Sequence, residues 1–279
     1  MLANYIGTPE SNQFNKVAKR LREFFHSKGF QEVHTQDRLS ILAACEDPTT
    51  VATYEYAGQR WPLPQTGQMW LEYELLQTPD VSGVFCMSTS FRNEPNPVPG
   101  RHKIIFPMFE FESRGTLDDL REMERDLCEF LGFGTKELYA HVKYEEAAKA
   151  LGVEEITGSS EKRLEKRHGP VVFLEKFPLK TSPFWNMKVE GNTANKIDVL
   201  LGGMETIGSA ERSSDVKRMR EQFHTISDGQ YAVLLFDLFG QKRVENELED
   251  FLSLPFVPRY GGGIGMARLM KAMQGVGAL

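Results

Sequence analysis

Several features that mark large classes of proteins are scarce or missing in this sequence. No apolar run approaches the ~18 residues that a membrane-spanning helix needs. The N-terminus lacks the basic-then-apolar pattern of a signal peptide. The three cysteines, Cys45, Cys86 and Cys128, are odd in number and unrelated in spacing, which predicts neither a disulfide framework nor a zinc site. We therefore expect a cytoplasmic protein without a membrane partner.

An excess of basic residues is also missing. The sequence has 33 Lys and Arg against 39 Asp and Glu, a net charge of -6. It thus lacks the global basic footprint that drives nucleic-acid binding, which disfavours a tRNA partner without excluding it. No low-complexity tract or internal repeat divides the 279 residues. A chain of this length can bury one large core, and we expect a single domain over residues 1–279.

The residues best suited to nucleotide chemistry surround a predicted hairpin. Residues 84–88 and 105–111 are apolar runs rich in strand formers, and the Pro- and Gly-containing segment 96–100 separates them. Arg92, at the end of the first run, can form a fork onto a phosphate. Phe106 offers an apolar face for a base. The alternative is a surface hairpin with ordinary charges.

The order Phe-Arg-x-Glu, loop, Arg-His-x-x-x-Phe at this hairpin resembles motif 2 of the class II aminoacyl-tRNA synthetases. The resemblance implies that Arg92 holds the α-phosphate of ATP and is catalytic. It implies that Glu94 reads the adenine amine and that Phe106 stacks on adenine. Arg101 or His102 would reach the outer phosphates.

A second cluster lies further along the chain. Asp198 and Glu205 are seven residues apart with two glycines between them, so they fit adjacent strands joined by a tight turn. Two such carboxylates facing a triphosphate can hold Mg²⁺. The spacing is similar to that of the aspartyl/asparaginyl branch, where both acids serve the ATP-bound magnesium. There, Arg212 would read the substrate side-chain oxygen, and Ser209 would lie in a turn that brings the backbone close to the ligand.

The C-terminal segment 261–269 is glycine-rich and precedes an apolar-periodic stretch. It resembles motif 3, Gly-x-Gly-x-Gly-x-x-Arg, which implies that ATP lies against Gly263 and Gly265 and that Arg268 is a second catalytic cation at the γ-phosphate. A dinucleotide fingerprint is the alternative, but no strand-helix-strand unit follows. Ala267 stands where the family has an acid that precedes this arginine.

Amino-acid recognition is expected in two places. Glu46 lies where the same branch binds the substrate α-ammonium, although a solvated loop residue is an equal alternative. The helix that starts near Gln68 resembles the substrate-recognition helix. Leu71 replaces the lysine of aspartyl members, while Gln68 and Glu72 match asparaginyl members. This favours an amide substrate, unless Glu72 is merely a solvated helix residue.

The N-terminal part resembles motif 1, the dimer-interface element of the family. Residues 12–28 have helical apolar spacing, and an extended segment with Phe30 and Val33 follows. The resemblance implies a homodimer, although Gln36 replaces the usual proline. Residues 116–131 are expected as a capped helix, 133–169 as a helical insertion, and 176–185 as a border of the amino-acid pocket.

The resemblance covers residues 12 to 279 and implies an α+β fold, an antiparallel sheet flanked by helices. Because the resemblance to motif 1 begins near residue 12, we expect a stand-alone paralogue without the family's anticodon-binding domain. We expect an ATP- and Mg²⁺-dependent ligase that forms an acyl-adenylate from an asparagine- or aspartate-like acid and transfers it to an amine. The alternatives are an ammonia-dependent asparagine synthetase, a truncated tRNA ligase and a non-catalytic regulatory paralogue.

Overall fold

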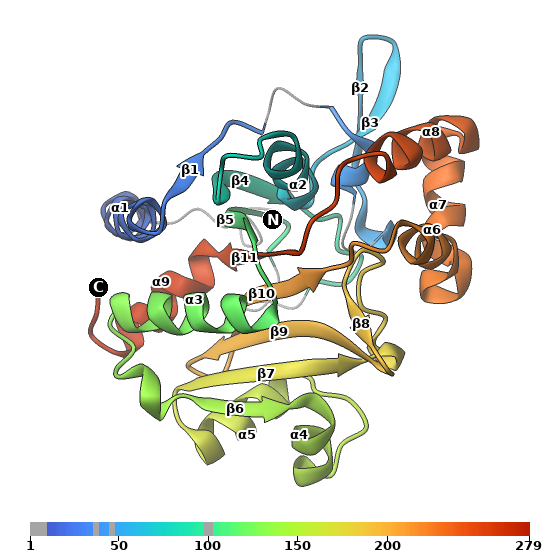
Figure 1. Ribbon diagram of the computed structural model, residues 1–279. Coiled ribbons are helices and arrows are strands. Elements are labelled where there is room, and N and C mark those ends of the chain that lie inside the picture. Colours follow the sequence, from blue (N-terminus) through green and yellow to red (C-terminus); the bar gives the residue numbers. More distant parts are fainter. Residues whose placement is uncertain (1–9, 36–38, 45–47, 98–102) are drawn as a thin grey trace.

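The computed structural model describes residues 10–35, 39–44, 48–97 and 103–279. Within them a sheet of nine strands forms the centre, and helices pack on both faces (Figure 1). The strand order is β1-β4-β5-β11-β10-β9-β7-β6, and β8 pairs with β9 beside this path. All neighbours are antiparallel except β1 with β4 and β6 with β7, which confirms the α+β class. The strands are β1 Phe30–Glu32, β4 Gly83–Phe91, β5 Ile105–Arg114, β6 Ala140–Lys143, β7 Val171–Pro178, β8 Val189–Glu190, β9 Thr193–Leu201, β10 Glu205–Arg212 and β11 Arg259–Gly265.

One face of the sheet is covered by three helices, α1 Ser11–Ser27, α3 Leu117–Phe130 and α9 Met266–Gly275 (Figure 1). Their apolar faces pack on alternate strand residues, and the resulting core contains a cluster of phenylalanines from α1, β4 and β5. The predicted helices over 12–28 and 116–131 are therefore present. The capping box that Thr116 and Asp119 form explains the start of α3.

On the other face, the described helices lie towards its two ends. At one end α2 (Gln68–Gln77) packs on β4 and β5, and at the other α4 (Tyr144–Leu151) and α5 (Gly158–His168) pack on β7 and its neighbours. Between them Gly263 on β11 pairs with Gly208 on β10, and Gly261 on β11 pairs with Ala210. This middle part forms the floor of the candidate site.

Three further helices, α6 Val216–Thr225, α7 Gln230–Phe239 and α8 Gln241–Leu252, form a second core around the buried Trp185. A separate two-stranded hairpin, β2 (Thr53–Tyr56) with β3 (Gln59–Pro62), extends beside this layer (Figure 1). The described residues also contain short 3-10 helices: η2 Ile41–Ala43, η3 Pro48–Thr50, η4 Lys136–Leu138, η5 Leu179–Thr181 and η6 Ile226–Gly229.

Two sequence-based expectations change in the structure. Residues 133–169 contain the expected helices α4 and α5, but also strand β6, which extends the main sheet. Phe30, expected near a dimer contact, is 6% exposed and packs against Phe25 inside the chain's own core. Gln36 lies outside the described residues. No helix of the described chain is long and apolar enough to cross a membrane.

Candidate active site

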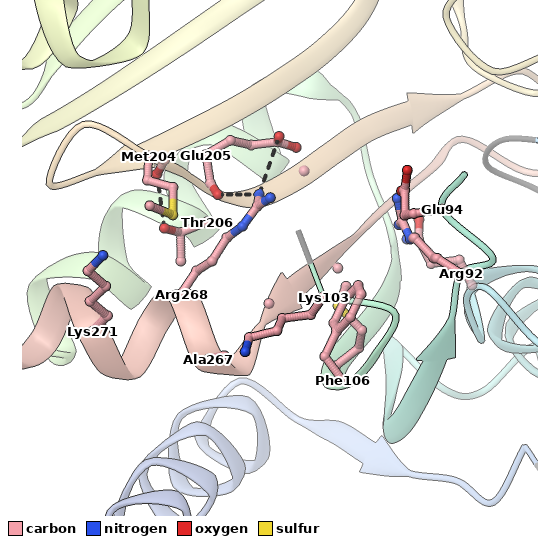
Figure 2. Close-up of a pocket in the computed structure, with 15 residues that line it drawn as sticks. Arg92, Glu94, Lys103, Phe106, Met204, Glu205, Thr206, Ala267, Arg268 and Lys271 are labelled. Atoms are coloured by element: carbon pink, nitrogen blue, oxygen red, sulfur yellow. Dashed lines mark hydrogen bonds and ion pairs between the residues drawn. The ribbon is translucent and has the colours of Figure 1, made fainter. Parts of the chain in front are cut away.

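A cavity of about 360 Å³ lies over the glycine floor where the β4–β5 hairpin meets α9. Arg92, Glu94 and Phe106 line it from the hairpin, and Arg268 lines it from the first turn of α9. Figure 2 shows Arg92 and Glu94 on one side of this space and Arg268 on the other. The motif 2 and motif 3 residues described by the structure therefore converge on one cavity.

Each of the two arginines is held in place by a neighbour. The guanidinium carbon of Arg92 lies 5.6 Å from the centroid of the Phe106 ring, and its Nε donates to Ser90 Oγ at 3.3 Å. Arg268 donates from Nη1 to the Glu205 carbonyl oxygen at 2.7 Å, and its side chain lies 3.6 Å from the Glu205 carboxylate (Figure 2). Such preorganised cations suit the phosphates of a nucleotide.

Close approach to the floor requires glycine. A Cβ atom on Gly263 would lie 2.7 Å from Met108 Cε and 3.2 Å from Gln68 Nε2. At Gly261 it would lie 2.0 Å from the Glu112 carboxylate. The contact at Gly261 is shorter than atoms tolerate, so a side chain there would displace Glu112, and a side chain at Gly263 would require Met108 and Gln68 to shift.

The two predicted metal ligands lie on adjacent strands, as their spacing suggests. The point where a Cβ on Gly208 would lie is 3.1 Å from Glu205 Oε1 and 3.8 Å from Asp198 Oδ1, so both carboxylates converge there. Asp198 is only 8% exposed. Burial raises its pKa, Lys196 lowers it, and the charge of Glu205 raises it further.

These acids fit a magnesium ion in type, because Mg²⁺ uses one or two carboxylates and completes its shell with water and phosphate oxygens. Among the described residues, no group of three or more His, Cys, Asp or Glu forms a closed metal cage. The carboxylates of Asp198 and Glu205 therefore suit a metal that also takes phosphate oxygens as ligands. One feature modifies it: Lys196 Nζ lies 2.6 and 2.8 Å from the two Asp198 carboxylate oxygens.

A second cavity of about 360 Å³ adjoins the first. Its walls include Phe177, Pro183 and Phe184 from segment 176–185, which therefore borders a pocket as predicted. Ile156, from the α4–α5 connection, closes another side; its backbone N–H donates to the Tyr144 hydroxyl at 2.9 Å. Among the described residues, both cavities share Gln68, Glu205 and Gly208.

Arg212 lines this second cavity and is 4% exposed. It donates from Nε and Nη2 to Glu112 Oε1 at 3.0 and 2.5 Å, and from Nη2 to Gln68 Oε1 at 2.5 Å. Burial raises the pKa of Glu112, while the Arg212 guanidinium opposes that shift. The arginine is thereby fixed beside the cavity by residues from two other elements.

Glu72 is also fully buried and lines the cavity. Arg259 donates to its Oε2 from Nε at 2.9 Å and from Nη2 at 2.6 Å, and Asn186 donates to its Oε1 at 2.6 Å. Glu72 is therefore not a solvated helix residue, which was the alternative that the sequence left open. Leu71 packs into the core between α2 and β4, away from the cavity.

Comparison with known proteins identifies the family. Residues 12–278 match the pattern described as "tRNA synthetases class II (D, K and N)". The chain belongs to this family. An aspartate--tRNA(Asp) ligase of Thermococcus kodakarensis is 25% identical over 93% of this chain and 63% of its own length. An asparagine--tRNA ligase of Koribacter versatilis is 23% identical over 75% of this chain and 55% of its own length.

Solved structures show the same class II fold. An asparaginyl-tRNA synthetase from Pyrococcus horikoshii, complexed with asparaginyl-adenylate, matches with a TM-score of 0.74 at 22% identity, covering 95% of this chain and 66% of that one. An aspartyl-tRNA synthetase from Entamoeba histolytica matches with a TM-score of 0.67 at 20% identity, covering 55% of that chain. This class II synthetase chain thus spans about two thirds or less of the relatives it matches.

The class II motifs explain where most predicted residues lie. Arg92, Glu94, Phe106, Gly263, Gly265 and Arg268 line the first cavity, Gln68 and Glu205 line both, and Glu72, Ser209 and Arg212 line the second. Ser209, however, lies in the middle of strand β10 and not in a turn, because β10 continues to Arg212. Its hydroxyl donates to the Ile197 carbonyl oxygen at 3.2 Å. Glu46, Arg101 and His102 fall outside the described residues.

Other residues of the candidate site were not predicted. Glu110 accepts from the Gly67 backbone N–H at 2.7 Å and from the hydroxyls of Thr66 and Ser88, which fixes the start of α2. Lys103 lines the first cavity and Lys196 the second. The spacing Lys196-x-Asp198 was an available signal, because residues two apart in a strand share a face.

Proposed function

We propose that this chain is an ATP-dependent, AMP-forming ligase that activates an asparagine- or aspartate-like amino acid. It forms an acyl-adenylate with release of pyrophosphate and transfers the acyl group to an amine acceptor. The observation that carries this proposal is the junction of the two cavities at Gln68, Glu205 and Gly208. A nucleotide in the first cavity and an amino acid in the second would meet at that junction. Family membership supports the same chemistry.

The first step asks for positioning and charge. A carboxylate oxygen of the amino acid bonds to the α-phosphorus of ATP as the bond to pyrophosphate breaks. Arg92 and Arg268 border the nucleotide cavity and would stabilise the charge that develops on the phosphate oxygens. Magnesium bound at Asp198 and Glu205 would add positive charge to those oxygens. In the second step an amine nitrogen attacks the acyl carbon, AMP leaves with the bonding pair, and the amine loses a proton.

The charges beside the second cavity favour an amide side chain. Arg212 and Arg259 are each matched by one buried glutamate, Glu112 and Glu72. A substrate carboxylate would add a third anion to this set, whereas an amide leaves the formal balance unchanged. We expect metal-free protein to prefer asparagine over aspartate by roughly ten- to a hundredfold, the range of a lost buried hydrogen bond of ~1–3 kcal/mol. Calorimetry in the presence of EDTA compares the two amino acids directly.

A small amine is the proposed acceptor. The net charge of -6 gives no basic footprint for a polyanion, although the relatives named above are tRNA ligases. The test is a pyrophosphate-exchange screen across amino acids, followed by product analysis with ammonia, simple amines and tRNA. Pyrophosphate exchange with aspartate, together with formation of asparagine when ammonia is added, would establish the asparagine synthetase alternative. Charging of tRNA would establish a tRNA ligase. If no amino acid supported pyrophosphate exchange, the non-catalytic regulatory paralogue would be the remaining alternative.

We also propose a two-fold dimer. Among the described residues β1 is the outermost strand of the sheet, and its Gln31 and Glu32 are exposed, so this edge could meet a second copy. Phe30 cannot be a principal contact because the chain's own core already buries it. Light scattering at micromolar concentration should report twice the chain mass of 31.7 kDa. A mass equal to one chain would contradict the dimer.

A further inference from the structure

Lys196 forms an ion pair with Asp198, one of the two predicted metal ligands. Its Nζ lies 2.6 and 2.8 Å from the two carboxylate oxygens of Asp198, so it contacts both oxygens at once. The side chains are 22% and 11% exposed, so water screens this pair only weakly. A carboxylate held in this way already has a counter-ion.

The lysine side chain faces the amino-acid cavity. Lys196 lines the second cavity, whereas Asp198 is not among the residues that line either cavity. The Lys196 ammonium also lies 3.8 Å from the centroid of the Phe177 ring, which forms a wall of the same cavity. Its four-carbon stem can carry the ammonium away from Asp198 without leaving this space.

We propose that Lys196 and the divalent cation compete for Asp198, and that metal binding transfers the lysine ammonium to the amino-acid cavity, where it pairs with a substrate carboxylate. The proposal rests on the proposed function, because it takes the metal and the amino acid from there. The reason is electrostatic: Mg²⁺ binds carboxylate oxygens at about 2.0–2.1 Å. An ammonium on the same two oxygens would face a double positive charge at close range, so both cannot remain.

The exchange changes the charge of the cavity. With Lys196 on Asp198, the pair is formally neutral and the balanced Arg–Glu pairs determine which substrate is accepted. Once the metal takes Asp198, the cavity gains one positive charge from Lys196. Aspartate should then bind more tightly relative to asparagine than in the metal-free protein. Metal and carboxylate binding are therefore linked, and each should raise the affinity for the other by the same factor.

The direct test is the binding of Mn²⁺, followed by its electron paramagnetic resonance signal, to protein saturated with α,β-methylene ATP. Lys196→Met removes the ammonium but keeps the length of the side chain over Phe177. Its Mn²⁺ affinity should exceed that of the wild type by about tenfold, within the usual range of such couplings. Lys196→Gln should show the same increase in Mn²⁺ affinity, and it provides a second variant in case Lys196→Met does not fold. Lys176→Met is the matched control, because Lys176 pairs with Glu190 on the same sheet, lines neither cavity and carries the same charge.

Equal Mn²⁺ affinities in folded wild type, both Lys196 variants and the control would overturn the competition. Calorimetry with aspartate, with and without Mn²⁺, tests the second part. The affinity of the wild type for aspartate should rise when Mn²⁺ is present, and that of Lys196→Met should not. An equal rise in both proteins would contradict the proposal that the Lys196 ammonium moves to the cavity. If Mn²⁺ binds to none of the proteins, the metal site of the proposed function fails as well. If Mn²⁺ binds but the affinities do not differ, the competition alone fails.

Discussion

Arg212 Nη2 on β10 lies 2.5 Å from Glu112 Oε1 on β5, although strand β11 separates the two strands. The contact crosses directly over Gly261, which pairs with Glu112 on one side and Ala210 on the other. The missing side chain at position 261 is what allows a glutamate and an arginine from non-adjacent strands to meet. The position of Arg212, which lines the second cavity, thus depends on Gly261, which lines neither cavity.

Gly261→Ala should therefore impair amino-acid binding more than nucleotide binding. The new Cβ would lie 2.0 Å from the Glu112 carboxylate and must displace it, which releases Arg212 from its hydrogen bonds. We expect KM for the amino acid to rise at least about tenfold, the effect of a buried hydrogen bond of ~1–3 kcal/mol, with KM for ATP changing much less. Gly275→Ala is the control, because its Cβ would meet no heavy atom within 4 Å and Gly275 lines neither cavity. Equal effects on both substrates would contradict this assignment.

Arg92→Ala should abolish most adenylate formation while the fold persists. Removal of one preorganised cation at a developing charge typically lowers the rate ~10²–10³-fold. Arg220→Ala removes an exposed arginine paired with Glu249 and should leave the rate unchanged. ATP–pyrophosphate exchange measures both variants, and circular dichroism checks their fold. A rate within a few-fold of wild type in Arg92→Ala would refute the role of Arg92.

Glu72→Ala should destabilise the fold strongly. It leaves Arg259 buried without its carboxylate partner, a loss that typically costs about 3–5 kcal/mol. Glu249→Ala breaks an exposed ion pair with Arg220 and should cost no more than about 1 kcal/mol. Urea denaturation measures both free energies of unfolding. Similar small losses in the two variants would show that the buried pair adds little.

Glu175 should make stability sensitive to acid. Burial raises its pKa, but hydrogen bonds with His141 and Arg121 outweigh this and hold the pKa near 2, below the ordinary 4.5. Because the folded-state pKa is the lower one, ionised Glu175 stabilises the fold above pH 4.5. That contribution is lost as the pH falls from 4.5 towards 2.

Thermal unfolding of Glu175→Gln and wild type across this range provides the measurement. Wild type should be the more stable protein above pH 4.5, and the difference should shrink as the pH approaches 2. Glu145→Gln, at an exposed position in the first turn of α4, is the control and should show no such convergence. A wild-type advantage that stays constant down to pH 2 would be incompatible with the lowered pKa.

Local patterns in the sequence were sufficient for the hairpin and for the acidic pair. The runs at 84–88 and 105–111 alternate as strands do, and their separation by a Pro/Gly segment gave β4 and β5 correctly. The seven-residue spacing of Asp198 and Glu205 placed both on adjacent strands. Helix α3 was equally clear, because its cap and its periodic apolar face are both short-range features.

The buried charge pairs could not be predicted in the same way. Arg259 and Glu72 are 187 positions apart, and nothing in either neighbourhood indicates the other. Strand β6 has only four residues and joins the sheet through a parallel pairing with β7, which depends on long-range packing. The turn expected around Ser209 was wrong for a related reason: Gly208 there opens space above a strand and does not break it.

The cleft has two halves, and among the described residues only Gln68, Glu205 and Gly208 belong to both. Tyr144 and Ile156 line the second cavity, which we propose for the amino acid, and no described residue of their segment lines the first cavity, which we propose for the nucleotide. Under the proposed function, changes there should alter which acid is activated and leave the residues that line the first cavity in place. A directed-evolution library confined to Tyr144, Ile156 and their neighbours should therefore yield variants that accept new acids and use ATP as before. The fold would then be a modular starting point for making amide bonds.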